Sequence, residues 1–164
     1  MDPIQIVLAV ATVLCSLVAG LVFAFAIVIM PGIKSLEDRD YLKAFAVMDR
    51  VIQNNQPVFI FVWIGSAFSV ITLLILSFWQ LEGAHRVWAI VLPAIYLVGV
   101  QLPTIIINIP LNNRLQSLDL NNLSQSELST IRKEFESRWT YSNSFRTIVA
   151  TFVTTGLVIL ALKL

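Results

Sequence analysis

The amino-acid sequence predicts an all-α fold, an integral membrane four-helix bundle with amphipathic helices in its inner loops. Four stretches without a charged side chain support this prediction: Pro3 to Ile33, Val51 to Leu81, Val87 to Asn113 and Thr147 to Leu162. A helix needs roughly 20 apolar residues to cross a bilayer, and the first three stretches exceed that length. Hydrophobic residues make up 57% of the chain and charged residues 13%, far from the composition of soluble domains. We therefore expect a single transmembrane domain over residues 1–164, in contact with the lipid bilayer.

The expected spans cover residues 4–30, 58–81, 87–109 and 145–164. The fourth charge-free stretch is too short to cross a bilayer, so the last helix must enter the membrane near Phe145 and Arg146. Arg146 is therefore expected at membrane depth. The first stretch is too long for the apolar core of a secretory signal, and Asp2 stands where a signal has a basic flank. We expect it to be a retained helix.

Lysine and arginine are concentrated in the two long segments that join the first span to the second and the third to the fourth. The other side of the membrane has only Arg86 and Lys163. By the positive-inside rule the richer side is cytoplasmic, so both termini are expected to be non-cytoplasmic and the long loops cytoplasmic. No basic run is interleaved with aromatic residues, so nucleic acid is not an expected partner.

Each inner loop contains a predicted amphipathic helix. The first covers residues 36–53, where Ser35 and Asp38 have the spacing of a capping box. The second covers residues 125–144 and begins with the stronger S-x-x-E pair of Ser124 and Glu127. Each is expected to lie at the membrane interface or in the cytoplasm.

The second inner helix is followed by no proline or glycine before Gly156. Two arrangements are open, one long helix that runs into the fourth span or a kinked pair of helices. In the long helix, Trp139 and Tyr141 are expected at the level of the lipid headgroups, where aromatic belts form.

Small and polar residues indicate how the spans meet. Small residues recur every four positions in two spans and favour close packing there. They are Ser16, Gly20 and Ala24 in the first span and Gly65 and Ser69 in the second. In the third span Pro93 and Pro103 are expected to kink the helix. Gln101, Thr104 and Asn108 share one face of that span, which is expected to point into the bundle because lipid would leave their polar groups without partners.

Asparagines and Arg146 gather at the inner ends of the helices. An ionisable residue within the membrane is a functional-site hypothesis, because burying its charge is costly. The alternative is structural: carbonyls, amides or a lipid phosphate neutralise Arg146 and anchor the helix.

Four segments carry a family resemblance: GLVFAFAIVIMPGI, AFAVMDRVIQNNQPVF, NIPLNNRL from Asn108 and WTYSNSFRT from Trp139. In this order they resemble the anthrone oxygenase-like family, whose bacterial members are mostly four-helix membrane proteins of unknown function. The most specific part pairs an Asn-x-Pro-x-Asn motif at 108–112 with the downstream Trp and an Asn-x-x-Arg ending at 143–146. The chain departs from the family at Asn55-Gln56-Pro57, where members often read Asn-Pro, and near Tyr141, where a second Trp is common.

The resemblance implies oxidation of an anthrone, a polycyclic phenolic ketone, to an anthraquinone by molecular oxygen. The chain has one histidine and one cysteine, and it has no E-x-x-H or C-x-x-C pair, so no metal site and no cofactor is expected. His85 is expected to be a solvated loop residue and Cys15 a packing residue. If the chain is an enzyme, we expect a metal-independent oxygenase or oxidoreductase.

The candidate ligand-binding residues combine the polar cluster with the family motif: Asn108, Asn112, Trp139, Asn143 and Arg146, with Asn55, Gln101 and Thr104 as secondary candidates. Arg146 and the amides could stabilise a substrate anion by charge-assisted hydrogen bonds. No catalytic residue is assigned, because nothing in the sequence establishes the reach of Asp49 or Glu136, the two carboxylates considered as a general base.

Three functions compete at this stage. The first is a protein that binds or oxidises an apolar aromatic or quinone-like molecule at the inner-leaflet end of the bundle. The second is a non-catalytic membrane module that binds lipid or a partner protein. A transporter or channel ranks last, because no span has a carboxylate relay or a charge-lined face. The sequence leaves a homo-oligomer open.

Overall fold

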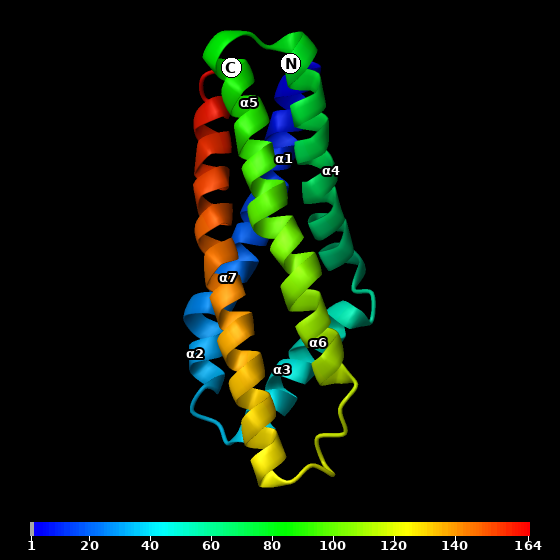
Figure 1. Cartoon of the computed structure of the whole chain (residues 1–164). Helices are drawn as coiled ribbons and strands as arrows, with labels where there is room; N and C mark the ends of the chain where they lie inside the picture. The colour runs from blue at the N-terminus through cyan, green and yellow to red at the C-terminus, as the bar shows by residue number, and fades with distance from the viewer. Residues whose placement is uncertain (1) are drawn as a thin grey trace.

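The protein, described by a computed structural model over residues 2–164, is built from helices and their connections, without strands in this range (Figure 1). Four helical rods run along the molecule: α1 (Pro3–Ala24) with η1 (Phe25–Ile29) and α2 (Met30–Ile33); α4 (Pro57–Gln80); α5 (Gly83–Tyr96) with η2 (Leu97–Gln101), η3 (Thr104–Asn108) and α6 (Ile109–Gln116); and α7 (Gln125–Ala161). Each rod is long and apolar enough to cross a membrane. The expected fold class is confirmed, and the chain is a multi-pass membrane protein.

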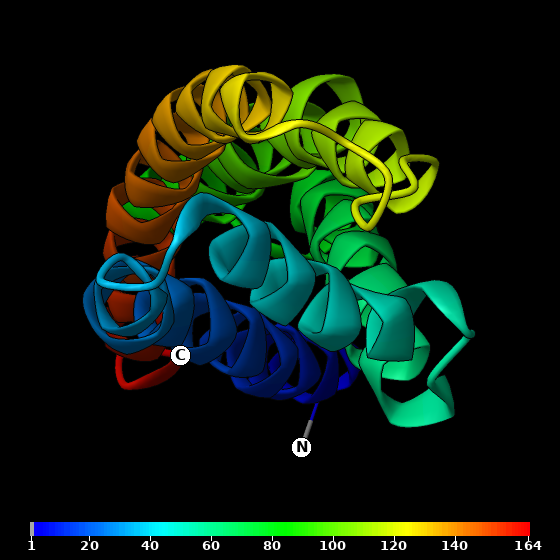
Figure 2. The ribbon, with the colours of Figure 1, turned by 90° about the horizontal axis from the view of Figure 1, so that it is seen from below.

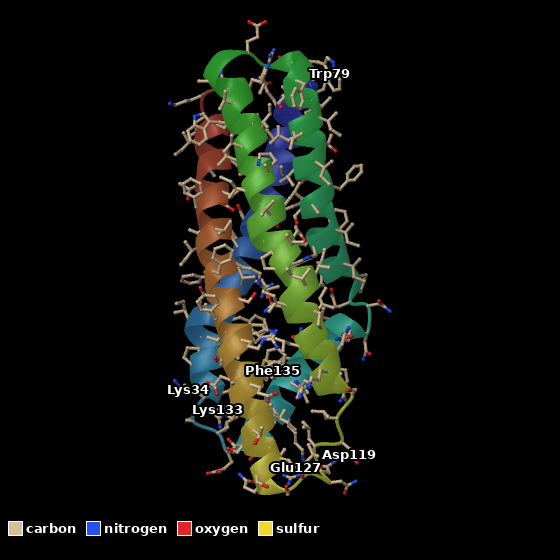
Figure 3. All side chains as sticks on the ribbon, in the orientation of Figure 1. Lys34, Trp79, Asp119, Glu127, Lys133 and Phe135 are labelled. Carbon is tan, nitrogen blue, oxygen red and sulfur yellow. The ribbon has the colours of Figure 1, made fainter. Side chains whose placement is uncertain are left out.

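Different segments cover the two ends of the bundle. Both termini and the short turn between α4 and α5 lie at one end, here called the termini end (Figure 1). The remaining helix, α3 (Asp38–Gln53), crosses the other end, which also carries the 117–124 loop and is here called the α3 end (Figure 2). Lys34, Asp119, Glu127 and Lys133 are found at the α3 end, and Trp79 at the termini end (Figure 3). Sidedness stays a prediction of the charge distribution.

Two apolar clusters fill the interior. In the larger cluster the spans close a ring, because α1 packs against α4 and α7, and α5 packs against α4 and α7. The second cluster lies at the α3 end, where α3 packs against α6 and α7 around Tyr41, Phe45 and Trp139. Val18, Val70 and Val153 represent the first cluster and are fully buried. The candidate site described below is lined by residues of both clusters.

The third span contains two π-helical segments close to its prolines. Segment η3 begins directly after Pro103 and ends shortly before Pro110, while α5 continues through Pro93 and passes into η2. A proline lacks the N–H of the regular helical ladder, and a local i→i+5 turn is one way to accommodate the disturbed bonding. The expected distortion of the third span thus takes the form of π turns. Thr104 and Asn108, two candidate site residues, lie in η3.

The two predicted helix starts in the inner loops have different outcomes. At the start of α7 the capping box is present, with Ser124 N donating to Glu127 Oε2 at 2.8 Å and Glu127 N donating to Ser124 Oγ at 3.4 Å. The capping box predicted at Ser35 was wrong. The Ser35 hydroxyl instead donates to the Gly32 carbonyl at 3.4 Å, and α3 starts at Asp38 without a side-chain cap. This serine therefore belongs to the turn that ends α2.

Helix α7 is one continuous helix, which decides between the two arrangements that the sequence left open. Its half at the α3 end is joined to the α2–α3 connection by Arg132. This guanidinium pairs with Asp38 and Glu136, both at 3.1 Å, and lies 4.3 Å from the centre of the Tyr41 ring. Burial raises the pKa of Tyr41, so its phenol stays neutral at physiological pH. These contacts fix α3 across the end of the bundle.

The predicted small-residue stripe of the first span does not pack inside the bundle. Ser16 and Gly20 are exposed on the outside of α1, and no atom lies within 4 Å of a Cβ built on Gly20. Gly65 does allow a close approach, because a Cβ there would lie 3.1 Å from Leu14 Cδ1. The sequence pattern was therefore informative in α4 and misleading in α1.

Two glycines of the spans are expected to respond oppositely to alanine. A Cβ at Gly99 would lie 2.7 Å from Val149 Cγ1, and a β-branched side chain has little freedom to move away. Gly99→Ala is expected to lower the free energy of unfolding by about 1–3 kcal/mol, the usual cost of overpacking. Gly20→Ala, the matched control, should leave stability unchanged or raise it by up to about 1 kcal/mol. Thermal unfolding of both variants in one detergent checks this; equal shifts would contradict the packing of η2 against α7.

Candidate functional site

A cavity of about 140 Å³ lies near the α3 end, between the ends of the spans and α3. Aromatic rings from four elements form much of its wall. They are Phe25 of η1, Phe45 of α3, Phe59 and Trp63 of α4, and Trp139 of α7. The polar groups of the wall are Asp49, Thr104, Asn108, Asn112, Asn143 and Arg146. All five primary candidates from the sequence line this cavity, and so does Thr104.

Arg146 enters the cavity wall from the middle of α7. It is buried, with 4% of its surface exposed. Its Nη1 donates to Thr104 Oγ1 at 2.8 Å and its Nη2 to Asn143 Oδ1 at 2.9 Å. Among the ion pairs of the described residues none includes Arg146, so its positive charge is held by neutral oxygens. A cation buried in this way favours a ligand that carries negative charge or a strongly polarised oxygen.

Asn143 has a fixed orientation that supports Arg146. Its Nδ2 donates to the Val22 carbonyl at 2.9 Å, so its Oδ1 is turned toward the guanidinium. That carbonyl lies close to η1, where π-helical turns interrupt the α-helical ladder. The amide therefore links α7 to α1 and places an acceptor beside Arg146.

Two residues that line the cavity each have a buried donor without an acceptor within residues 2–164. These donors are Nδ2 of Asn108 and Nε of Arg146. The Asn108 side chain is 3% exposed, and its Oδ1 accepts a hydrogen bond from Ser142 Oγ at 2.7 Å, which leaves Nδ2 as the free group. A buried donor without an acceptor costs about 1–3 kcal/mol, so a native structure rarely retains one without a reason. Each of these donors therefore has hydrogen-bonding capacity that no described residue uses.

A second polar chain joins α7 to α3. Trp139 Nε1 donates to Asn112 Oδ1 at 2.9 Å, and Asn112 Nδ2 donates to Asp49 Oδ1 at 2.7 Å. The reverse orientation of this amide would place its NH₂ against the indole N–H and its oxygen against the carboxylate, so the orientation is fixed. Gln53 and Gln116 donate to Asp49 Oδ2 at 3.2 and 3.0 Å. The carboxylate is thus held by three amides.

Trp139 is the centre of the aromatic wall. It is 4% exposed and packs against Phe25, Phe45 and Phe135, with ring centres 5.5, 5.1 and 6.4 Å apart. Trp139 therefore does not face lipid as a belt residue would, because its polar N–H finds a partner inside the protein, while its depth at the headgroups stays a prediction. Tyr141, 80% exposed, faces outward as a belt residue would. The Arg146 guanidinium lies 5.9 Å from the centre of the Trp139 ring.

Asp49 was missing from the sequence-based site list. It is 4% exposed and lines the cavity, although it stands in α3, outside the four spans. A signal for it was present: Leu42, Phe45 and Ala46 form the buried face of α3, and Asp49 follows at the same helical spacing. A carboxylate on an apolar face was the clue.

Two secondary candidates lie outside the cavity. Gln101 faces into the bundle as expected, but it donates to Ser66 Oγ at 3.3 Å, and that hydroxyl is 2.9 Å from the Tyr96 hydroxyl. This polar group lies among the buried residues of the spans. Asn55 is exposed in the turn before α4, where its φ of 59° satisfies the turn geometry. The face predicted for Gln101, Thr104 and Asn108 is buried throughout.

Other titratable groups stand apart from the cavity. Glu136 is bound to Arg132, and His85 lies at the termini end. The prediction of a loop position for His85 was wrong, because Gly83 starts α5 and places His85 in its first turn. There it lines a larger cavity of about 380 Å³ with Trp88, Phe152 and Lys163. Within residues 2–164, no three His, Cys, Asp or Glu side chains come together as a metal site.

The comparisons with known proteins show the family. No curated protein and no solved structure matches the chain at a significant level. The family model described as anthrone oxygenase matches residues 45–156, about two thirds of the chain. The matched range includes every polar residue of the cavity wall, while the α1 part of the wall precedes it. This chain of four membrane-spanning helices, with its buried arginine and asparagines around one cavity, therefore belongs to the anthrone oxygenase family.

Proposed function

We propose that this protein binds an apolar aromatic ketone, phenol or quinone in the cavity at the α3 end and oxidises a compound of the anthrone type there with molecular oxygen. The observation that carries the proposal is a cavity rich in aromatic side chains, two of whose lining residues, Asn108 and Arg146, each keep a buried donor without an acceptor among the described residues. Aromatic walls suit a flat apolar ring, and the two donors suit its oxygen.

The size of the cavity limits how a substrate enters. A volume of about 140 Å³ is close to the roughly 150 Å³ of an engineered apolar cavity that binds benzene. One substituted ring therefore fits inside. The remaining rings of a polycyclic substrate would extend past Phe59 and Ile109, which stand at the cavity wall and are not fully buried. Ile109 is 44% exposed, and this side of the bundle leads toward lipid.

The chemistry that suits these residues begins with an anion. When an anthrone loses a proton from the carbon opposite its carbonyl, the negative charge spreads onto the carbonyl oxygen. The guanidinium of Arg146 and the amide of Asn108 would donate to that oxygen and stabilise the charge. The anion then reacts with oxygen, and the sum of the reaction is one anthrone plus one O₂ giving one anthraquinone plus one water.

Binding is tested by the fluorescence of the tryptophans. Quinones quench indole emission at short range, and Trp63 and Trp139 line the cavity, whereas Trp79 and Trp88 do not. Anthraquinone titrated into the purified protein in detergent micelles is expected to quench emission saturably. The quench should fall when Trp63 and Trp139 are replaced by phenylalanine together, and persist in the matched Trp79→Phe, Trp88→Phe variant. Equal quenching in both variants would indicate that the quinone is dissolved in the micelle.

Turnover is tested in the same preparation with an oxygen electrode. Anthrone should cause oxygen uptake above the rate of protein-free micelles, with one anthraquinone formed for each O₂ consumed. Saturable binding without added oxygen uptake would reject the oxygenase and leave a binding protein for aromatic ketones. Absence of both would reject the proposal.

A further inference from the structure

The cavity has a second polar end, formed by a carboxylate. Asp49 and Arg146 are the two titratable side chains on its wall. They do not form an ion pair with each other. Asp49 lies on α3 and Arg146 on α7, with the indole of Trp139 and the amide of Asn112 on the wall between these elements. A molecule in the cavity is thus exposed to a negative group and a positive group at once.

We propose that Asp49 is the catalytic base of this site, and that its Oδ1 accepts the proton that the substrate loses. The inference rests on the proposed function and adds the group that the sequence left unassigned. In this step a C–H bond of the ring ketone breaks and its electron pair stays on the substrate, spread onto the carbonyl oxygen held by Arg146 and Asn108. The proton forms an O–H bond with Asp49. The step needs no oxidant.

The hydrogen bonds of Asp49 single out the accepting atom. Oδ2 accepts from both Gln53 and Gln116, whereas Oδ1 accepts only from Asn112. A carboxylate has about four acceptor positions, so the described contacts leave one on Oδ1. The three amides hold the group in place, as a base must be held within reach of the proton it removes.

The charges on the wall assist this transfer. Negative charge moves from Asp49 into the substrate ring and toward the buried guanidinium of Arg146, away from a carboxylate and toward a cation. In a site that excludes water such fixed charges act strongly and need no rearrangement during the reaction. The alternative carboxylate, Glu136, does not line the cavity and is engaged by Arg132 at 3.1 Å.

The experiment separates proton removal from oxidation. Anthrone is incubated with the purified protein in D₂O without oxygen, and deuterium uptake at its acidic carbon is followed by mass spectrometry against protein-free micelles. Wild-type protein is expected to accelerate the exchange. Asp49→Asn should reduce the protein-dependent rate by about 10²–10⁴-fold, the usual contribution of a general base. Glu136→Gln, the matched control, should keep the wild-type rate.

A second variant is needed because Asp49→Asn could lose activity by disturbing the three amides that contact residue 49. Asp49→Ala removes the carboxylate and leaves space, so added formate should restore exchange in proportion to its concentration, while wild type should not respond. Anthraquinone quenching in each Asp49 variant reports whether the site is still formed.

The outcomes distinguish the two proposals. Exchange at the wild-type rate in Asp49→Asn, or loss of quenching in both variants without rescue by formate, would overturn the role of Asp49 as base. In the first case another group or water removes the proton, and in the second Asp49 only holds the site together. Wild-type protein that neither binds anthraquinone nor accelerates exchange would overturn the proposed function itself, and with it the inference.

Discussion

Replacing Arg146 by methionine is expected to abolish oxygen uptake with anthrone while the protein remains folded. The substitution removes the guanidinium that donates to Thr104 and Asn143 and whose Nε has no acceptor among the described residues. Loss of one oxyanion donor costs about 10²–10³-fold in turnover. A charge-assisted hydrogen bond contributes about 1.5–3 kcal/mol, so the affinity for anthraquinone should fall roughly 10- to 100-fold.

The stability of this variant distinguishes a ligand site from a structural anchor. Arg146 is buried without a carboxylate partner among the described residues, and replacing such a charge by an apolar side chain of similar size is often neutral or stabilising. Losing its bonds to Thr104 and Asn143 acts in the opposite direction. We expect a change of at most about 1–2 kcal/mol, measured by thermal unfolding in one detergent.

Arg138→Met is the matched control for Arg146. Arg138 lies on the same helix and is exposed, so its replacement should change neither turnover nor stability. A fall in stability of more than about 3 kcal/mol in Arg146→Met, with binding and turnover unchanged, would identify Arg146 as an anchor of α7 and reject the ligand site.

Trp139→Ala is expected to cause the largest loss of stability. The indole is 4% exposed and contacts three phenylalanine rings, and removing a buried aromatic side chain of this kind costs about 3–5 kcal/mol. The substitution also leaves Asn112 Oδ1 without its donor. A strong fall in the unfolding temperature, with loss of anthraquinone binding, is the expected result.

Trp139→Phe and Tyr141→Ala serve as controls for this prediction. Phenylalanine keeps most of the ring contacts and removes the indole N–H, so it should cost about 1–2 kcal/mol, the scale of one hydrogen bond. Tyr141 is 80% exposed on the same turn, and its truncation should have little effect in detergent. Similar losses for Trp139→Ala and Tyr141→Ala would contradict the packing at the α3 end.

Most of the fold could be predicted because the composition of a short segment indicates whether it forms a membrane helix. Runs of apolar residues long enough to cross a bilayer predict four spans, and the described residues form four helices of that kind. The start of α7 was equally local, since Ser124 and Glu127 satisfy each other within one turn. The prediction failed at Ser35, where a weaker S-x-x-D pattern had a competing partner in the Gly32 carbonyl.

The candidate site was predicted in part. Asn108, Asn112, Asn143 and Arg146 were chosen because a polar cluster at the helix ends coincides with the family motif, and all four line one cavity. Gln101 was chosen because polar groups within a span need partners, and it found its partners elsewhere in the bundle. Polarity in an apolar span indicates that a side chain faces inward, but not which neighbour it meets.

The sequence by itself determined that this protein is a bundle of membrane helices, because length and hydrophobicity of a segment decide whether it can cross a bilayer. Only the tertiary structure decided that Asp49 of α3 shares a cavity with Arg146 of α7, and that Asn108 Nδ2 and Arg146 Nε lack acceptors within residues 2–164. The physical reason is distance. A polar group is paired only when a partner atom lies within about 3 Å. That partner often comes from a helix far away in the sequence, and a local sequence pattern does not give the distance between them.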